Sequence, residues 1–257
     1  MRQRYHILDE IRGITLCSMI LYHAVWDLVY MFGNDWAWYQ SDFAYIWQQS
    51  ICWTFILLSG FCFSIGKRRV RRGLIVFAAG VLVSLVTEIF MPANRIRFGV
   101  LTLLGSCMLI FVLINWMRDK GGNLKSSPMP GMVLSFIAFI LSKRINDGYL
   151  GFADVRIFKL PKGLYRLGDF GNFLGFTENT FYSTDYFSLF PWFFLFLTGV
   201  CLYKWFLQRN WIERLSQLPS LGKWWRPIGR HSLIIYMVHQ PIIYGVLYFL
   251  YVIFPAL

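Results

Sequence analysis

The first apolar stretch of the chain carries side chains that can perform acid–base chemistry inside a membrane. Residues 8–30 are apolar and long enough for a helix, yet they contain Arg12, His23 and Asp27. Ionisable groups are costly in hydrocarbon, so they usually face a protein interior or a wet cavity. Arg12 and His23 are eleven residues apart, which puts them on nearly the same side of a helix. They lie about 16 Å apart along its axis.

Carboxylates flank both of these residues at helical spacing. Asp9 precedes Arg12 by three residues, and Asp27 follows His23 by four. Residues three or four apart on a helix can touch. We therefore predict that Asp27 contacts His23 and orients its ring, and that Asp9 contacts Arg12. The pattern indicates a polar track along one face of the helix.

The composition is typical of a protein that crosses a membrane many times. Hydrophobic residues make up 57% of the chain and charged residues 15%, whereas a soluble domain has about 25% charged residues. The net charge of +12 is interpreted as an orientation signal and as contact with lipid headgroups, not as nucleic-acid binding. The cysteines lie in apolar segments without a CxxC pair, so neither disulfides nor a metal site is expected.

Seven apolar segments approach the ~20 residues that a bilayer core requires. They lie near 8–30, 43–65, 73–91, 98–117, 129–145, 186–207 and 231–252. This predicts an all-α polytopic membrane protein, with a single domain over 1–257 and helices around a polar cavity. Lys and Arg are denser on the side of the N-terminus, which predicts that the N-terminus is inside and the C-terminus outside. Residues 146–185 are predicted to form an outer loop or lid.

Further polar residues in the predicted helices are pocket candidates. Gln48 and Gln49 either line a substrate path or bond to a neighbouring helix. His239 stands two residues before Pro241, which removes a backbone hydrogen bond and is expected to kink the last helix. His239 is therefore either a pocket residue or a structural hydrogen bonder. Asp9, beside Arg12, completes this group.

A basic turn, GKRRVRR at 66–72, follows the second apolar segment. It is either a topology determinant that touches anionic lipid or a surface that attracts the phosphates of a nucleotide-bearing donor. Under the second interpretation, Lys67, Arg68 and Arg69 bind the donor together with Arg12.

Four stretches resemble known membrane enzymes. LDEIRGITLCSMILYHA (8–24) resembles the opening of the transmembrane acyltransferase (acyltransferase-3-like) superfamily, whose first helix carries Arg, ten residues, then His. FGVLTLLGSCMLI (98–110), DYFSLFPWFFLFLTGV (185–200) and GRHSLIIYMVHQPIIYG (229–245) resemble the heparan-alpha-glucosaminide N-acetyltransferase-like catalytic family. The resemblance implies transfer of an acetyl or short acyl group from acetyl-CoA, or another acyl-CoA, to an extracytoplasmic sugar hydroxyl or amine.

The resemblance also bears on the catalytic residues. In the lysosomal members of the family that this sequence resembles, the catalytic His is expected in the loop after the first helix. Those members are expected to have Asn at the position that matches His23. This sequence has Asn34 and Asp35 in that loop, so both are pocket candidates. The third stretch places Asp185 at the mouth of the sixth helix.

Helix geometry and the resemblance together name His23, Asp27 and Arg12 as the catalytic candidates. His23 acts either as a general base toward the acceptor or as a covalent carrier of the acyl group. The sequence leaves both mechanisms open.

Other functions compete with acyl transfer. A proton-coupled small-molecule transporter also uses intramembrane Arg, His and Asp, although no inverted repeat is visible; a non-catalytic scaffold is a third interpretation. The expected location is a bacterial cytoplasmic membrane, as part of polysaccharide modification. The expected partners are acyl-CoA, an extracytoplasmic glycan or small acceptor, and membrane lipids, without nucleic acid or metal. Self-association into a homo-oligomer is left open.

Overall fold

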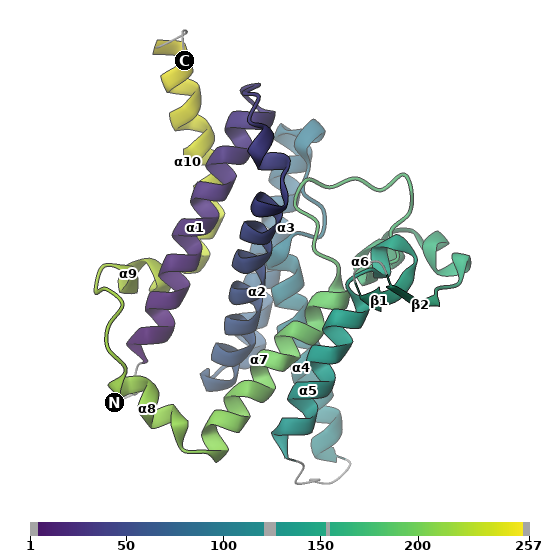
Figure 1. Ribbon diagram of the computed structural model, residues 1–257, viewed down its shortest axis with the longest axis vertical. Coiled ribbons are helices and arrows are strands. Elements are labelled where there is room, and N and C mark those ends of the chain that lie inside the picture. Colours follow the sequence, from purple (N-terminus) through teal and green to yellow (C-terminus); the bar gives the residue numbers. More distant parts are fainter. Residues whose placement is uncertain (1–4, 121–126, 153–154, 254–257) are drawn as a thin grey trace. The chain divides into compact units, whose positions relative to one another are not determined.

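The computed structural model describes residues 5–120, 127–152 and 155–253, and nearly all of its regular structure is helical (Figure 1). Within this part of the chain, seven helices are long and apolar enough to cross a membrane. They are α1 (His6–Tyr30), α2 (Asp42–Ile65), α3 (Arg69–Phe90), α4 (Val100–Lys120), α7 (Leu189–Gln208), α10 (Ser232–Ile253) and the span Pro128–Asp147, which begins with α5 (Pro128–Ser142). The prediction of an all-α polytopic membrane protein is confirmed.

The last long helix continues through its proline. Proline removes one backbone donor, yet α10 is assigned as one helix on both sides of Pro241. The sequence predicts a kink at this position; α10 is one helix through Pro241, and the kink itself stays a prediction. His239 and Gln240 are therefore presented from a continuous helix.

The chain divides into two compact units. Unit 1 comprises residues 1–55 and 210–257, so it contains α1, the first part of α2, and α10. It also contains three short helices: η1 (Ala37–Gln40), α8 (Trp211–Gln217) and α9 (Trp225–Arg230). α1 packs against both α9 and α10.

α1 and α10 lie side by side in unit 1 and run in the same direction (Figure 1). Successive contacts advance along both helices: Gln240 meets Asp27, and Tyr251 meets Asn34 just beyond the end of α1. The first turn of α1 and the last turn of α10 therefore lie at opposite ends of this unit.

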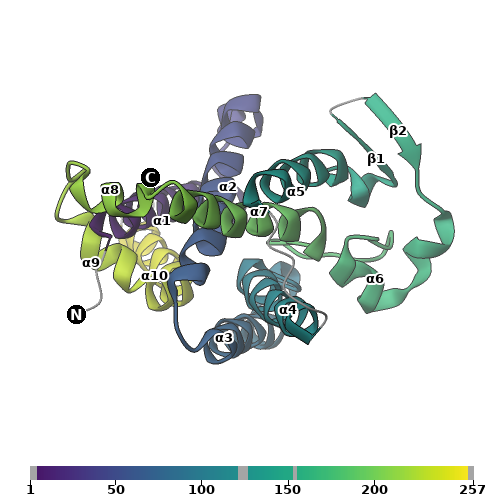
Figure 2. The ribbon, with the colours of Figure 1, turned by 90° about the horizontal axis from the view of Figure 1, so that it is seen from below.

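Unit 2 comprises residues 56–209. Its helices pack as two main pairs, α3 with α4 and α5 with α7 (Figure 2). Buried aromatic rings fill its core: the Phe63 ring lies 6.2 Å from Phe111 and 5.8 Å from Phe196. A buried hydrogen bond of 2.9 Å between Ser135 and Thr198 joins α5 to α7.

The segment between α5 and α7 is more ordered than the loop that the sequence predicted. It contains η3 (Ile145–Asp147), strands β1 (Tyr149–Phe152) and β2 (Val155–Lys159), η4 (Lys162–Arg166) and α6 (Gly168–Leu174). The strands pair antiparallel. The hydroxyl of Tyr165 donates to the carbonyl of Ile145, and burial raises the pKa of this phenol. A role as a lid is untested and stays a prediction.

A second group of contacts ties this segment to the connection between α3 and α4. Arg97 forms an ion pair of 2.6 Å with Asp169, and its guanidinium lies over the ring of Phe181. Glu88, at the end of α3, pairs with Arg95 at 3.7 Å. These residues all belong to unit 2. η2 (Pro92–Asn94) lies in the same connection between α3 and α4.

Candidate active site

Polar side chains of α1 and α10 meet along the line where the two helices pack. We call this line the α1–α10 seam. Its members are His23, Asp27, Asn34, His239, Gln240 and Tyr251. All six belong to unit 1, and all but Asn34 lie on the two helices. A line of polar groups between two apolar helices is the usual mark of a functional site in a membrane protein.

Two histidine rings lie against each other at one end of the seam. The ring centroids of His23 and His239 are 5.0 Å apart, and the planes are tilted by 60°. Nδ1 of His239 lies 2.5 Å from the carbonyl oxygen of Tyr236. A carbonyl only accepts, so Nδ1 carries the proton, and Nε2 is an acceptor when the ring is neutral. The structure thus brings together two histidines that the sequence had selected separately.

Asp27 has a different partner from the one that its spacing predicted. Its side chain is 1% exposed, and Oδ1 accepts a hydrogen bond of 2.6 Å from Nε2 of Gln240. Within the described residues no hydrogen bond joins Asp27 to His23. Residues four apart on one helix can touch, but α10 offers Asp27 a better-placed amide donor. The predicted contact between Asp27 and His23 is corrected accordingly.

The Asp27–Gln240 pair leaves two acceptors unsatisfied. Oδ2 of Asp27 and Oε1 of Gln240 are buried and have no donor among the described residues. Buried polar atoms are nearly always hydrogen-bonded, so an unsatisfied one needs an explanation. Two acceptor oxygens in the seam suit a ligand that brings N–H or O–H donors.

Asn34 and Tyr251 close the seam beyond the end of α1. Nδ2 of Asn34 donates to the Tyr251 hydroxyl at 2.5 Å and to the Leu28 carbonyl at 2.9 Å. Asn34 is half-buried, whereas its neighbour Asp35 is exposed. Of these two loop candidates, the structure places only Asn34 in the seam.

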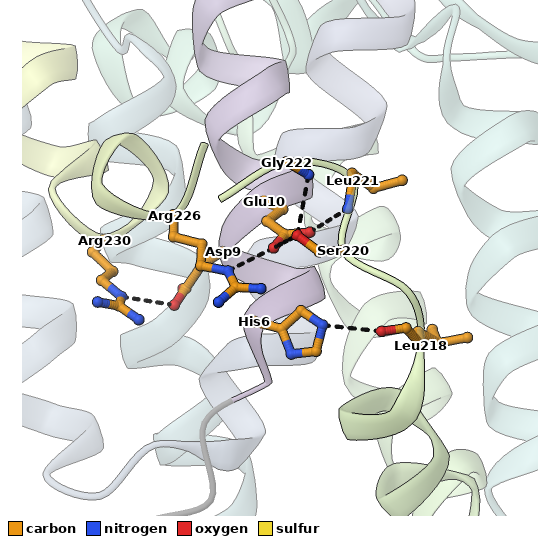
Figure 3. Close-up of polar contacts among 9 residues, drawn as sticks. All are labelled: His6, Asp9, Glu10, Leu218, Ser220, Leu221, Gly222, Arg226 and Arg230. Atoms are coloured by element: carbon orange, nitrogen blue, oxygen red, sulfur yellow. Dashed lines mark hydrogen bonds and ion pairs between the residues drawn. The ribbon is translucent and has the colours of Figure 1, made fainter. Parts of the chain in front are cut away.

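The other end of α1 is held by a buried carboxylate (Figure 3). Glu10 is 0% exposed and accepts from three donors in the segment between α8 and α10. These are the Ser220 hydroxyl at 2.7 Å, the Leu221 backbone N–H at 2.7 Å and Nε of Arg226 at 2.6 Å. A buried charge is tolerated only when it is paired and hydrogen-bonded in this way. Glu10 therefore fixes α9 and the preceding loop to α1.

Asp9 sits beside this clamp and faces two arginines. One oxygen lies 3.4 Å from Nη1 of Arg12, which confirms the predicted pairing, and the other lies 3.4 Å from Nε of Arg230. The side chains of Arg12, Arg226 and Arg230 are 21%, 26% and 43% exposed. We call these three residues the arginine cluster.

Two glycines allow α9 to approach α1 this closely. A Cβ at Gly229 would stand 1.9 Å from the carbonyl oxygen of Asp9, and one at Gly13 would stand 2.3 Å from that of Trp225. Both obstacles are backbone atoms, which cannot rotate away. The contact between the two helices is therefore made backbone to backbone, and it fixes where Arg226 and Arg230 project.

The remaining candidates belong to other parts of the chain than α1 and α10. In α2, Gln49 accepts a hydrogen bond of 3.0 Å from Trp53, and Gln48 is half-buried; both belong to unit 1. Asp185 is half-buried in unit 2. The basic turn also belongs to unit 2. Its three predicted donor-binding residues are Lys67, Arg68 and Arg69.

Sequence reasoning missed several partners in these sites. Glu10 stood out only as one more ionisable residue of the first apolar segment, and the sequence named no partner for it. Gln240 and Tyr251 looked like ordinary residues of the last helix, and the α9 arginines looked like topology signals. The one available signal was the adjacency of Gln240 to His239. The others depend on contacts between segments more than 200 positions apart, which spacing along one helix does not reveal.

The fold and the seam define a multi-pass integral membrane protein with ionisable groups inside its spanning helices. The family described as heparan-alpha-glucosaminide N-acetyltransferase, catalytic, matches residues 4–241. The chain belongs to this family, whose members are in general membrane acetyltransferases. The matched region includes both histidines of the seam. No curated protein and no solved structure matched the chain.

Proposed function

We propose that this protein transfers an acetyl or short acyl group from a cytosolic acyl-CoA to an acceptor outside the membrane. The proposed acceptor is a sugar hydroxyl or amine, within polysaccharide modification at a bacterial cytoplasmic membrane. The observation that carries the proposal is the paired seam, in which His23 lies against His239 and Asp27 is held by Gln240, within a chain of this family.

The chemistry assigned to His23 is proton transfer. The acceptor oxygen or nitrogen attacks the thioester carbonyl carbon, so that a C–O or C–N bond forms while the C–S bond breaks. His23 takes the proton from the acceptor and returns it to the departing thiolate. In the covalent alternative, an imidazole nitrogen attacks first and carries the acyl group until the acceptor takes it.

The neighbouring residues position the reacting groups. The His239 ring packs against His23 and limits its rotation. The two unsatisfied acceptors, Oδ2 of Asp27 and Oε1 of Gln240, are placed to receive hydrogen bonds from the acceptor's hydroxyl or amino groups. In this proposal Asp27 contacts the acceptor. The orienting of His23, which the sequence had assigned to Asp27, is assigned to His239 instead.

The proposed donor enters from the side that bears the N-terminus. Arg12 lies about 16 Å along α1 from His23, a length that an extended pantetheine arm spans. Lys67, Arg68 and Arg69 remain proposed donor contacts from unit 2. The parallel packing of α1 and α10 supports termini on opposite sides, as the charge distribution predicted.

The test is transfer by the purified protein in proteoliposomes. Acetyl-CoA labelled in the acetyl group is supplied on one side, and a panel of amino sugars and neutral sugars on the other. The proposal expects labelled sugar and free coenzyme A in equal amounts. Uptake of intact label or sugar without release of coenzyme A would instead support the proton-coupled transporter, and the proposed function would be wrong.

A further inference from the structure

We propose that the arginine cluster (Arg12, Arg226 and Arg230) is a binding site for a phosphate group. The inference rests on the proposed function in so far as the nucleotide part of the donor supplies that phosphate. The same chemistry would suit the headgroup of an anionic lipid. The site lies entirely in unit 1, near the start of α1. Figure 3 shows two of its members, Arg226 and Arg230, beside Glu10 and Asp9.

The arginines are held by contacts that leave most of their donors available. Arg226 reaches Glu10 through Nε, and Arg230 reaches Asp9 through Nε. Within the described residues, the terminal nitrogens of both make no hydrogen bond to another side chain. A guanidinium carries five N–H donors in a planar fork, which matches the oxygens of a phosphate. Two such forks therefore remain available for an anion.

Asp9 behaves as a weak internal partner that an anion can replace. Its contacts to Arg12 and Arg230 are both 3.4 Å, longer than the 2.7–2.9 Å that is usual for strong charge-assisted bonds. Glu10, in contrast, is fully buried and satisfied by three bonds of 2.6–2.7 Å. Glu10 is the scaffold of the site, and Asp9 occupies the place of the ligand.

The backbone keeps the three guanidinium groups together. Arg226 and Arg230 are four residues apart on α9, so they share one face of that helix. Gly229 and Gly13 allow α9 to lie directly on α1, next to Arg12. The cluster is thus a fixed arrangement of three cations against two carboxylates, and of the three arginines only Arg226 contacts Glu10.

The position of the cluster fits the seam. Arg12 and His23 project to nearly the same side of α1 and are about 16 Å apart along it. A phosphate held by Arg12 and Arg230 would let a thioester at the end of a pantetheine arm reach His23. Phosphate recognition is thereby assigned to residues of unit 1 itself.

The experiment measures binding of coenzyme A and of 3′-dephospho-coenzyme A to the purified full-length protein. Arg12→Gln and Arg230→Gln should each weaken coenzyme A binding by roughly tenfold, the loss of one charge-assisted contact. Asp9→Asn should tighten binding by about threefold, because it removes the competing carboxylate. Arg214→Gln, which removes one exposed charge on the neighbouring helix α8, is the matched control and should change nothing.

A second arm distinguishes the two sources of phosphate. The same variants are placed in nanodiscs of phosphatidylglycerol or phosphatidylcholine, and their thermal stability is compared. A selective loss of coenzyme A binding assigns the site to the donor. A selective loss of stabilisation by phosphatidylglycerol assigns it to a lipid headgroup, and both results support a phosphate site.

The proposal is overturned if Arg12→Gln, Arg230→Gln and Asp9→Asn behave like the control Arg214→Gln in both coenzyme A binding and stabilisation by phosphatidylglycerol. The gain expected for Asp9→Asn guards against misfolding, since a damaged protein does not bind more tightly. If the wild type binds no coenzyme A at all, the proposed donor is wrong, while the lipid arm still decides whether the cluster binds phosphate.

Discussion

Asp27 shows how strongly one side chain in this family member depends on a partner from another helix. Asp27 is a buried acidic residue, and its side chain accepts one hydrogen bond, from the amide of Gln240. An isolated carboxylate in a membrane interior would be costly, so its retention indicates a role beyond packing. The proposed function assigns the unsatisfied oxygens of the Asp27–Gln240 pair to hydrogen bonds with the acceptor.

Replacing Asp27 by Asn tests this role at the residue scale. Asn keeps the shape and still accepts from Gln240, but it loses the charge. We expect the rate of acyl transfer to fall by roughly tenfold to a hundredfold, which corresponds to the loss of one hydrogen bond to a charged group, with donor affinity unchanged. Initial rates with labelled acetyl-CoA provide the measurement. Asp35→Asn, at an exposed position, is the control; an equal loss there would show that the effect is not specific to the seam.

At the scale of elements, the contact of α9 with α1 matters most. It rests on two glycines with backbone atoms of the opposite helix directly above them. The contact holds the Glu10 clamp and the arginine cluster in one place. α10 follows α9 directly, so the same contact also fixes the start of α10, the helix that carries His239.

Gly229→Val should disrupt this contact. The added side chain would collide with the Asp9 carbonyl, and overpacking of this kind typically costs about 1–3 kcal/mol. The melting temperature in detergent should fall, and coenzyme A binding should weaken with it. Gly245→Ala in α10 is the matched control, because nothing lies within 4 Å of its added Cβ. Its melting temperature should stay or rise, since Ala favours a helix over Gly. A stable Gly229→Val protein would mean that α9 can move away from α1.

The contrast between sequence and structure is clearest among these elements. The seven spans were predictable, because length and apolar content are local properties. The contact between Asp9 and Arg12 was also local and is confirmed. The pairing of Asp27 was mispredicted, because the rule for spacing on one helix takes no account of Gln240 on another. The Glu10 clamp joins positions more than 200 residues apart, and no periodicity reports such a contact.

At the scale of the whole molecule, the open question is which side of the membrane each end of the chain occupies. The chain crosses the membrane several times, and the basic residues predict that the N-terminus is inside. Unit 1 and unit 2 are each compact. The expectation of a single domain over residues 1–257 stays a prediction, as does the lid at 146–185.

Topology can be tested with reporter fusions. A reporter fused after Leu257, which lies outside the described residues, should behave as extracytoplasmic. One fused near Lys120, after α4, should behave as cytoplasmic. Seven spans and the distribution of Lys and Arg both lead to this result. A cytoplasmic reporter at both positions would require an even number of spans and would place the arginine cluster and the C-terminus on the same side.

The proposed role of His23 in acyl transfer can be tested with a single substitution. Transfer of labelled acetyl by His23→Ala is compared with the wild type in proteoliposomes, beside coenzyme A binding on the same preparation. His231→Ala, an exposed histidine just before α10, is the control and should retain full activity. We predict that His23→Ala loses transfer by at least about a hundredfold while its affinity for coenzyme A stays unchanged. Transfer by His23→Ala at the wild-type rate would contradict the account and move catalysis to His239 or Asn34.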